Sequence, residues 1–204
     1  MQKAFIPSNN PEGMKNFKTG GGKSPSFFFF TDDKKFMIKT LKKSEKDILL
    51  QKGFLEDYFL YISKNPNSLL MKIFGIFELE LGPNRFVDFL ITENMIRQDF
   101  PRIFRCFDLK GSTYGRETKM EIGESKHGSG LKTLKDKNFI KIFKEGIEID
   151  PSEKMALFSQ MQRDSELLKK NNLIDYSVFL IQVDMQKAEA SHFGKKLQKL
   201  VFNA

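Results

Sequence analysis

Apolar residues near the start of the chain fall into short runs separated by polar turns. From Asn16 the sequence reads NFKTGGGKSPSFFFFTDDKKFMIKTLKK, in which a glycine-rich turn, a phenylalanine run and a second apolar run follow one another. This pattern predicts a meander of three strands joined by a loop and a turn. In the last strand, alternation places Phe36 and Ile38 on one face and Met37 and Lys39 on the other. Lys39 is thus expected on a stiff strand beneath the glycine-rich loop.

The next apolar pattern, from Ser44 to Asn65, has helical spacing and begins with the cap-like SEKD. Gly53 is expected to break this helix. Two further apolar stretches, residues 69–81 and 85–91, are joined by the turn Gly82–Asn84 and predict a pair of antiparallel strands. The segment ITENMIRQD then leaves the sheet, at the position where a two-lobed kinase has its nucleotide-binding hinge.

The strongest helix signal of the second half is IDPSEKMALFSQMQRDSELLKKNN. Asp150 is the expected cap, Pro151 takes the first helical position and Glu153 completes a capping box. One face is kept apolar by three side chains, Leu157, Met161 and Leu168. The asparagine pair at the end of the segment, Asn171 and Asn172, is expected to end the helix.

Asp175 follows this helix and stands just before the apolar run Val178–Val183. A carboxylate at the junction of a helix and a buried strand is expected to be poorly solvated unless a ligand or a partner uses it. The alternative is an aspartate that caps a turn, and the residues leave both interpretations open.

The glycine-rich loop suits polyphosphate binding, because consecutive glycines let backbone N–H groups approach anionic oxygens while a nearby ammonium neutralises their charge. A hairpin with a flexible tip and a surface lysine is the alternative. The segment GGGKSPS is not a Walker loop, because a strand-like run follows it rather than a helix. A strand in this place favours a kinase-type cover over ATP.

A second polar stretch, FDLKGSTYGRET at Phe107–Thr118, sets Asp108 and Lys110 almost side by side. By themselves these residues fit either a turn or a phosphate-binding site.

Composition narrows the partners. With 34 Lys and Arg against 26 Asp and Glu, the net charge of +8 favours anionic partners such as nucleic acid, an acidic membrane surface or phosphorylated ligands. The single cysteine, Cys106, excludes an internal disulfide, and the opening MQKAFIPSNN lacks the apolar core of a signal peptide, so a cytoplasmic setting is expected. No apolar run approaches the roughly 20 residues that span a bilayer. Any membrane contact is therefore expected to be peripheral.

Three motifs together resemble the phosphatidylinositol phosphate kinases: GKSPSFFFF with MIKT, FDLKGSTYGR, and LIDYSVFLI after a helix. The segments NPNSLLMKIFGIF, RFVDFLITEN and TLKD also fit, so the resemblance covers residues 17–184. It implies an α+β, two-lobed kinase-like fold with an antiparallel N-lobe sheet plus helix and an incomplete C-lobe. Residues 1–204 would form one truncated domain, with an N-lobe at 14–92, a hinge at 92–100 and a partial C-lobe at 101–204.

The resemblance also implies roles for particular residues. Lys39 matches the lysine that contacts the α and β phosphates of ATP, with Glu45 or Glu56 as its ion-pair partner. Asp175 matches the catalytic aspartate, and Lys110, held in register by Asp108, matches a lysine that meets the transferring phosphate or the headgroup. The remaining residues that it assigns to the nucleotide are Gly22, Lys23, Ser24, Ser26, Glu93 and Met95. Those that it assigns to the substrate are Asp108, Lys110, Arg105 and Arg116.

The chain departs from the family pattern in three places. Pro25 replaces a loop glycine, which removes a donor and stiffens the loop. Cys106 replaces an arginine, which is interpreted as the loss of one headgroup charge. The sequence also ends before the acidic segment that supplies the second Mg²⁺-binding aspartate, so the metal ligand is unknown and a weakened transfer is expected.

The function expected from the resemblance is ATP-dependent, Mg²⁺-assisted phosphorylation of phosphatidylinositol phosphate to the bisphosphate, as in a phosphatidylinositol-4-phosphate 5-kinase. Such an enzyme is expected peripherally on the cytosolic face of anionic membranes, with the plasma membrane as the expected site. A lysine-rich stretch, Lys126–Lys144, is consistent with this docking. The alternatives are a catalytically impaired pseudokinase that binds phosphoinositide membranes and a nucleic-acid-binding module. Against the latter, the chain has no zinc-ligand set and no RNA-binding strand motif, so no nucleic-acid partner is expected.

Overall fold

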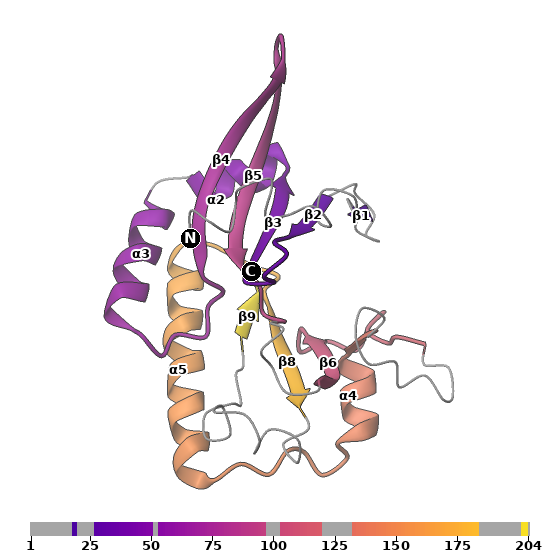
Figure 1. Ribbon diagram of the computed structural model, residues 1–204. Coiled ribbons are helices and arrows are strands. Elements are labelled where there is room, and N and C mark those ends of the chain that lie inside the picture. Colours follow the sequence, from indigo (N-terminus) through magenta and orange to yellow (C-terminus); the bar gives the residue numbers. More distant parts are fainter. Residues whose placement is uncertain are drawn as a thin grey trace. The chain divides into compact units, whose positions relative to one another are not determined.

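The computed structural model of the chain describes residues 18–19, 27–50, 53–96, 103–119, 132–183 and 201–203 (Figure 1). These residues form helices and two sheets in which most neighbouring strands are antiparallel, so the fold is α+β, as predicted. The chain divides into two compact units. The first consists of Met1–Phe59 and Met71–Asp99, and the second of Leu60–Leu70 and Phe100–Ala204. No helix within the described ranges combines the length and the apolar character needed to cross a bilayer.

The sheet of the first unit has five antiparallel strands in the order β1-β2-β3-β5-β4. Their bounds are β1 (Lys18–Thr19), β2 (Phe27–Phe30), β3 (Phe36–Leu41), β4 (Ile73–Gly82) and β5 (Arg85–Glu93). The predicted meander of the first three strands is confirmed. Strand β3 is paired on both sides, so Lys39 lies opposite Phe28 of β2 and Leu90 of β5. Because β3 is an interior strand, the backbone at Lys39 is held by hydrogen-bonded neighbours on both sides.

Two helices lie between β3 and β4, α2 (Lys43–Leu50) and α3 (Phe54–Lys64). The predicted break at Gly53 is confirmed, and its φ of 83° lies in a left-handed region that residues with a Cβ rarely adopt. The buried Tyr58 of α3 then fixes the approach to β4. Its hydroxyl donates to the carbonyl of Met71 (2.8 Å) and accepts from the N–H of Ile73 (2.9 Å).

The β4–β5 pair is antiparallel, as predicted, but its bounds differ from those expected. Strand β4 begins at Ile73 rather than at Leu69, because the N–H of Leu69 donates to Asp164 instead of to a strand neighbour (2.8 Å). Strand β5 continues past Ile91 to Glu93, because β3 offers pairing partners there, with Phe36 opposite Glu93. Long-range pairing thus set these ends.

The second unit has a four-stranded sheet in the order β7-β6-β8-β9, in which β6 and β7 are parallel and the other pairs antiparallel. Its strands are β6 (Ile103–Leu109), β7 (Thr133–Lys135), β8 (Ser177–Val183) and β9 (Val201–Asn203). The interpretation of Phe107–Thr118 as one polar stretch was wrong for its first three residues, which belong to β6. Phe107 is fully buried and packs against the rings of Phe139 and Phe143, at centroid distances of 5.4 and 5.8 Å.

The helices of this unit are α4 (Asp136–Ile142) and α5 (Pro151–Lys170). The predicted cap of α5 is confirmed, because the Asp150 carboxylate accepts from the N–H of Ser152 (2.9 Å). The predicted end is also confirmed. Asn171 follows the last helical residue, and Asn172 adopts a left-handed φ of 55°.

Asp164, on α5, is a buried polar centre that the sequence pattern did not indicate. It is fully buried, and its carboxylate accepts four hydrogen bonds. The donors are the Tyr61 hydroxyl (2.7 Å), the Ser68 hydroxyl (2.8 Å), the Gln160 amide (2.8 Å) and the Leu69 N–H (2.8 Å). Three of these donors come from the segment Leu60–Leu70, which explains why this segment belongs to the second unit.

Replacing Asp164 tests this explanation. Asp164→Ala leaves the partly buried donors of Tyr61, Ser68 and Leu69 without their acceptor, so the free energy of unfolding should fall by about 3 kcal/mol. Urea denaturation of both proteins measures the difference. Glu166→Ala, an exposed change on the same helix, is the control and should stay within about 0.5 kcal/mol of the unaltered chain. Equal effects of the two changes would contradict the role of Asp164.

Candidate functional site

Lys39 forms an ion pair with Glu45 of α2, at 2.7 Å between Nζ and Oε1. The sequence had left Glu45 and Glu56 open as partners, and the structure selects Glu45. The other oxygen of Glu45 accepts from the N–H of Lys42 (3.0 Å). Burial acts to raise the pKa of Glu45, but the hydrogen bonds from Lys39 and Lys42 outweigh it and hold the pKa below its ordinary value. Glu45 therefore keeps the Lys39 ammonium in place at neutral pH.

Of the other residues assigned to the nucleotide, Gly22, Lys23, Ser24 and Ser26 lie outside the described residues. Glu93 is the last residue of β5, and Met95 follows it in a turn. Asn94, which the sequence did not indicate, fixes this turn. The side-chain amide of Asn94 donates to the carbonyls of Lys34 (2.9 Å) and Ile96 (2.8 Å). Its backbone N–H donates to the carbonyl of Lys35 (2.8 Å).

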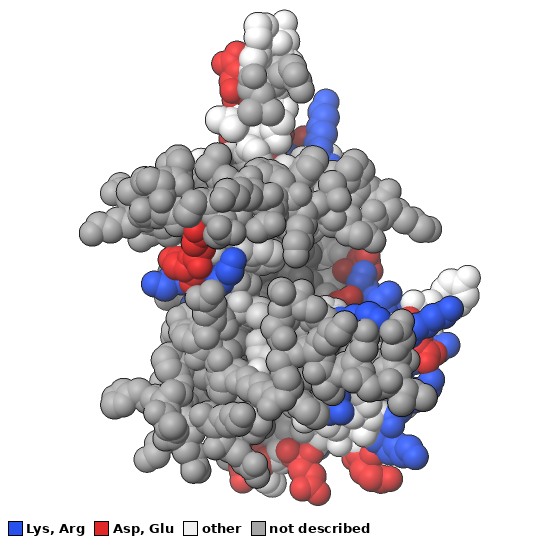
Figure 2. Space-filling model, turned by 45° about the vertical axis from the view of Figure 1, so that its right-hand side comes forward, with Lys and Arg blue, Asp and Glu red and all other residues white. Residues whose placement is uncertain are grey.

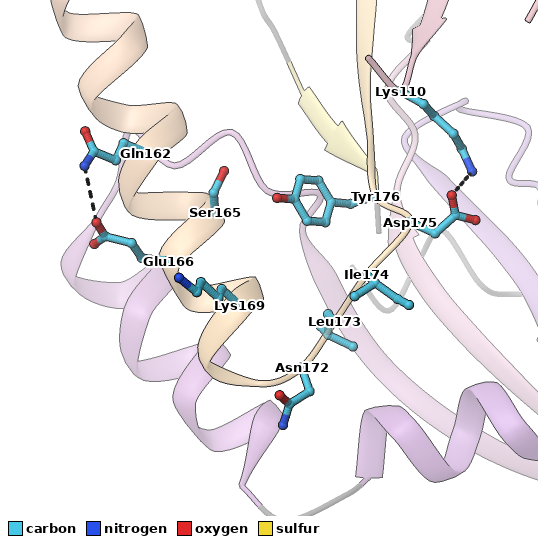
Figure 3. Close-up of a pocket in the computed structure, with 10 residues that line it drawn as sticks. All are labelled: Lys110, Gln162, Ser165, Glu166, Lys169, Asn172, Leu173, Ile174, Asp175 and Tyr176. Atoms are coloured by element: carbon cyan, nitrogen blue, oxygen red, sulfur yellow. Dashed lines mark hydrogen bonds and ion pairs between the residues drawn. The ribbon is translucent and has the colours of Figure 1, made fainter. Parts of the chain in front are cut away.

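In the second unit the structure brings Lys110 and Asp175 together, although 65 positions separate them in the sequence. Lys110 directly follows β6, Asp175 precedes β8, and their Nζ and Oδ1 atoms lie 2.6 Å apart (Figure 3). Asp175 adopts a left-handed φ of 65°. Backbone strain of this kind at an aspartate is found at functional sites more often than elsewhere.

The expectation that Asp175 is poorly solvated was wrong, because its side chain is 77% exposed. It lies in the turn between α5 and β8, where the backbone carries it away from the core. The hydrogen bond and the charge of Lys110 lower the pKa of Asp175 below its ordinary value, so the carboxylate is ionised at neutral pH. The pair accordingly favours folding above the unfolded-state pKa, and this contribution is lost as the pH falls through the lower folded-state pKa.

An open hollow of about 660 Å³ adjoins this pair (Figure 3). Its polar lining comes from both sides of the α5–β8 turn, with Glu166 and Lys169 on α5 and Asp175 and Tyr176 after it. Ile174, whose side chain is 87% exposed, supplies an apolar edge. The hollow thus presents the negative charge of Glu166 and the positive charge of Lys169 to a ligand, next to the ionised carboxylate of Asp175.

Asp108 and Arg116 form an ion pair with each other, and the Asp108 side chain is 29% exposed. The Arg116 guanidinium lies 3.1 Å from the Asp108 carboxylate and 2.8 Å from that of Asp136, and its side chain is 13% exposed. The backbone N–H of Lys110 donates to Asp136 (3.0 Å), and the register role of Asp108 stays a prediction. Arg105 lies near the opposite end of β6 and donates to Gln182 of β8 (3.1 Å).

Two residues of α4 were missed by the sequence analysis, Asp136 and Asn138, which are 6% and 4% exposed. Asn138 accepts from the N–H of Thr118 (2.8 Å) and donates to its carbonyl (2.9 Å). The available signal was TLKD, a short apolar-polar run with an acid where a helix begins. Burial acts to raise the pKa of Asp136. Hydrogen bonds from Arg116 and from backbone N–H groups lower this pKa by more, so it lies below its ordinary value.

Cys106 does not replace a surface charge in this chain. Its side chain is 1% exposed within β6, and burial raises the pKa of the thiol to about 11. The interpretation of Cys106 as a lost headgroup contact was therefore wrong, because the position faces the core.

Among the residues that the structure describes, no three His, Cys, Asp or Glu side chains gather as a metal-binding group.

These motifs and their geometry can be compared with known proteins. Residues 11–201 match the family described as Phosphatidylinositol-4-phosphate 5-Kinase. The chain belongs to this family. The resemblance to phosphatidylinositol phosphate kinases is thereby confirmed, and the match takes in Lys39, Lys110 and Asp175.

Relatives of this phosphatidylinositol-4-phosphate 5-kinase family chain occur in distant organisms. A probable phosphatidylinositol phosphate kinase of Dictyostelium discoideum is 39% identical over 175 residues, which are 84% of this chain and 23% of the relative. Phosphatidylinositol 4-phosphate 5-kinase 1 of Oryza sativa subsp. japonica is 37% identical over 167 residues, 78% of this chain and 20% of the relative. The its3 kinase of Schizosaccharomyces pombe is 33% identical over 163 residues, with the same coverage of 78% and 20%. The chain thus spans about a fifth of the length of these curated relatives.

The Lys110–Asp175 pair can be tested by titration. Removing the ammonium with Lys110→Met should let the pKa of Asp175 rise toward its ordinary value of about 3.9. Carboxyl ¹³C NMR across acidic pH measures this pKa. Lys169→Met, which removes an equal charge from the same hollow, is the control and should leave the pKa of Asp175 unchanged. A similar shift in both variants would show that general charge, and not the pair, sets the pKa.

Proposed function

We propose that this chain carries the phosphoryl-transfer site of a phosphatidylinositol phosphate kinase. The substrate would be the inositol headgroup of phosphatidylinositol 4-phosphate, and the product phosphatidylinositol bisphosphate, with ATP as the phosphate donor. The observation that supports this most directly is the Lys110–Asp175 ion pair at 2.6 Å, beside an open hollow, in a chain of this family.

Asp175 is proposed as the catalytic aspartate. Its carboxylate is ionised at neutral pH, so it can accept a hydrogen bond from the attacking inositol hydroxyl and then its proton. Lys110 holds this carboxylate in position and places an ammonium where negative charge moves during transfer. The exposure of the pair leaves it open to a headgroup at a membrane surface.

Lys39 is proposed to contact the α and β phosphates of ATP, as the corresponding lysine of kinases does. Lys39 lies where β3 is paired on both sides, and its ion pair with Glu45 of α2 supports this role, because a preoriented ammonium loses little freedom on binding. Glu93 and Met95, at the end of β5, are proposed to contact the nucleotide, and Gly22, Lys23, Ser24 and Ser26 to cover its phosphates. Mg²⁺ would enter with the nucleotide, where it neutralises charge on the phosphate oxygens.

Peripheral association with an anionic membrane is the third element of the proposal. Figure 2 shows lysine and arginine side chains gathered in one region of the surface, with acidic side chains among them. The described lysines around α4 are Lys132, Lys135, Lys137, Lys141 and Lys144, and four of these are exposed. Lys141 forms an ion pair with Glu117, which reduces the local surplus of charge. A lysine that lies near an anionic leaflet contributes about 1 kcal/mol of attraction.

Turnover with labelled ATP, Mg²⁺ and vesicles containing phosphatidylinositol 4-phosphate tests the proposal. The unaltered chain should form labelled phosphatidylinositol bisphosphate. Lys39→Met and Asp175→Asn should each lower turnover by about 100-fold or more, because they remove a phosphate contact and the proton acceptor. Glu166→Gln is a matched control, since it neutralises a carboxylate of the same hollow that has no proposed chemical role.

Vesicle binding without product in the unaltered chain would reject the kinase proposal and favour a phosphoinositide-binding protein. Equal turnover in Asp175→Asn and Glu166→Gln would reject Asp175 as the catalytic aspartate.

A further inference from the structure

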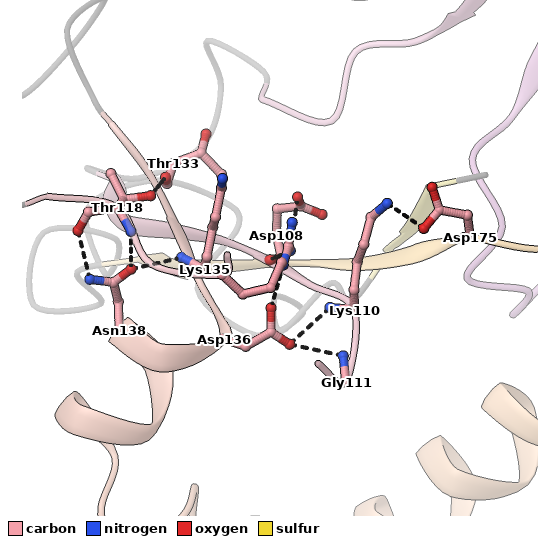
Figure 4. Close-up of polar contacts among 10 residues, drawn as sticks. Asp108, Lys110, Gly111, Thr118, Thr133, Lys135, Asp136, Asn138 and Asp175 are labelled. Atoms are coloured by element: carbon pink, nitrogen blue, oxygen red, sulfur yellow. Dashed lines mark hydrogen bonds and ion pairs between the residues drawn. The ribbon is translucent and has the colours of Figure 1, made fainter. Parts of the chain in front are cut away.

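Asp136 joins three positions that lie far from it in the sequence. It is the first residue of α4, and its side chain is 8% exposed. One oxygen of its carboxylate accepts from the backbone N–H groups of Lys110 (3.0 Å) and Gly111 (2.8 Å) (Figure 4). The other oxygen accepts from Nε of Arg116 (2.8 Å). A single buried side chain therefore binds both the beginning and the end of the loop that follows β6.

Arg116 completes this arrangement, which we name the Asp136–Arg116 clamp. A second nitrogen of the same guanidinium donates to the backbone carbonyl and to the carboxylate of Asp108. The loop between Asp108 and Arg116 is exposed from Gly111 to Gly115. Both glycines adopt left-handed φ values, 69° and 64°, which glycine adopts at little cost. The shape of the loop thus depends on the contacts at its base.

Building on the proposed function, we propose that Asp136 is a positioning residue that aims Lys110 at Asp175. A lysine side chain is long and flexible, so the average position of its ammonium group depends on how its backbone is held. Asp136 holds that backbone at Lys110 and at the next residue, and it binds the arginine that closes the loop. It acts through Lys110, not on the reacting groups themselves.

The chemistry of the clamp requires a carboxylate. Asp136 uses both oxygens as acceptors, one for two backbone N–H groups and one for the guanidinium. An asparagine has one acceptor oxygen, and its amide NH₂ would face the donors of Arg116. Asp136→Asn therefore preserves size while it breaks one half of the clamp.

Asn138 offers a matched control on the same helix. Asn138 is buried to a similar extent as Asp136 and also forms hydrogen bonds to the backbone of neighbouring segments. Its partners are Thr118 and the N–H of Lys135, not Lys110 (Figure 4). Asn138→Ala should weaken the packing of this region and leave the backbone at Lys110 held.

The first measurement does not depend on kinase activity. The full chain is treated with an amine-acetylating reagent, and acetylation of Lys110 is followed by mass spectrometry, with the exposed Lys144 as an internal reference. In Asp136→Asn the rate at Lys110 should rise about threefold to fivefold, the change expected when an exposed ion pair is lost. In Asn138→Ala it should stay at the level of the unaltered chain. Unchanged acetylation of Lys110 in a folded Asp136→Asn protein would overturn the proposal.

The second measurement is steady-state turnover on phosphatidylinositol 4-phosphate vesicles. Asp136→Asn should lower kcat by about 100-fold, as expected when a reacting group is displaced by about 1 Å, while the KM for ATP changes little. Equal losses of kcat in Asp136→Asn and Asn138→Ala would indicate a merely structural role and overturn the proposal. If the unaltered chain shows no turnover, the proposed function fails, and the acetylation rates alone decide the role of Asp136. Should Asp136→Asn not fold, Asp136→Glu takes its place, because its longer side chain displaces the carboxylate from the N–H groups of Lys110 and Gly111. A Lys110 rate equal to that of the unaltered chain would again overturn the proposal.

Discussion

A carboxylate that leaves water must find donors for both its oxygens, and in the second unit this requirement organises the chain twice. Asp164 is surrounded by donors from α5 and from the segment Leu60–Leu70, and Asp136 by donors from the loop after β6. Neither aspartate is an apolar core residue, yet each determines which parts of the chain lie together. Near Asp136, Phe107 packs against Phe139 of the same helix, α4.

The first unit is stabilised differently. Its strands pair along their length, whereas α2 has no buried residue and is attached through charged side chains. Lys46 reaches Glu78 (2.8 Å) and Asp88 (2.6 Å) on the β4–β5 pair, and hydrogen bonds to both carboxylates, Asp88 first, raise the pKa of Lys46 above its ordinary value. Glu45 binds Lys39 from the same helix. Ion pairs therefore hold α2 in position, and the orientation of Lys39 depends on the contacts of that helix.

Local patterns predicted most helices and strands correctly, because caps, breaks and alternation act over a few residues. Gly53, Asp150 and the asparagines after α5 are examples in which the side chain itself explains the end of an element. Contacts between distant segments were less accessible. Strand β6 was not recognised, because its pairing with β7 and β8 comes from segments far along the chain. The buried acids Asp136 and Asp164 resemble surface residues in a sequence, and only the fold reveals their donors.

The candidate site was predictable in part. The family resemblance identified Lys110 and Asp175, and the structure brings these two residues of the second unit together. It did not indicate the partners of Asp108 and Arg116, because identical motifs do not state which side chains bind one another. The choice of Glu45 over Glu56 likewise required the register of β3 and the path into α2.

The openness of Asp175 has a consequence for selectivity against water. A carboxylate whose side chain is 77% exposed orients any hydroxyl group that reaches it, and water competes with an inositol ring at a far higher concentration. Enzymes suppress such competition by closing a dry site around the reactants. The side chains described around Asp175 form an open hollow and no such enclosure. In the proposed reaction, a lipid surface against the hollow would help to exclude water from Asp175.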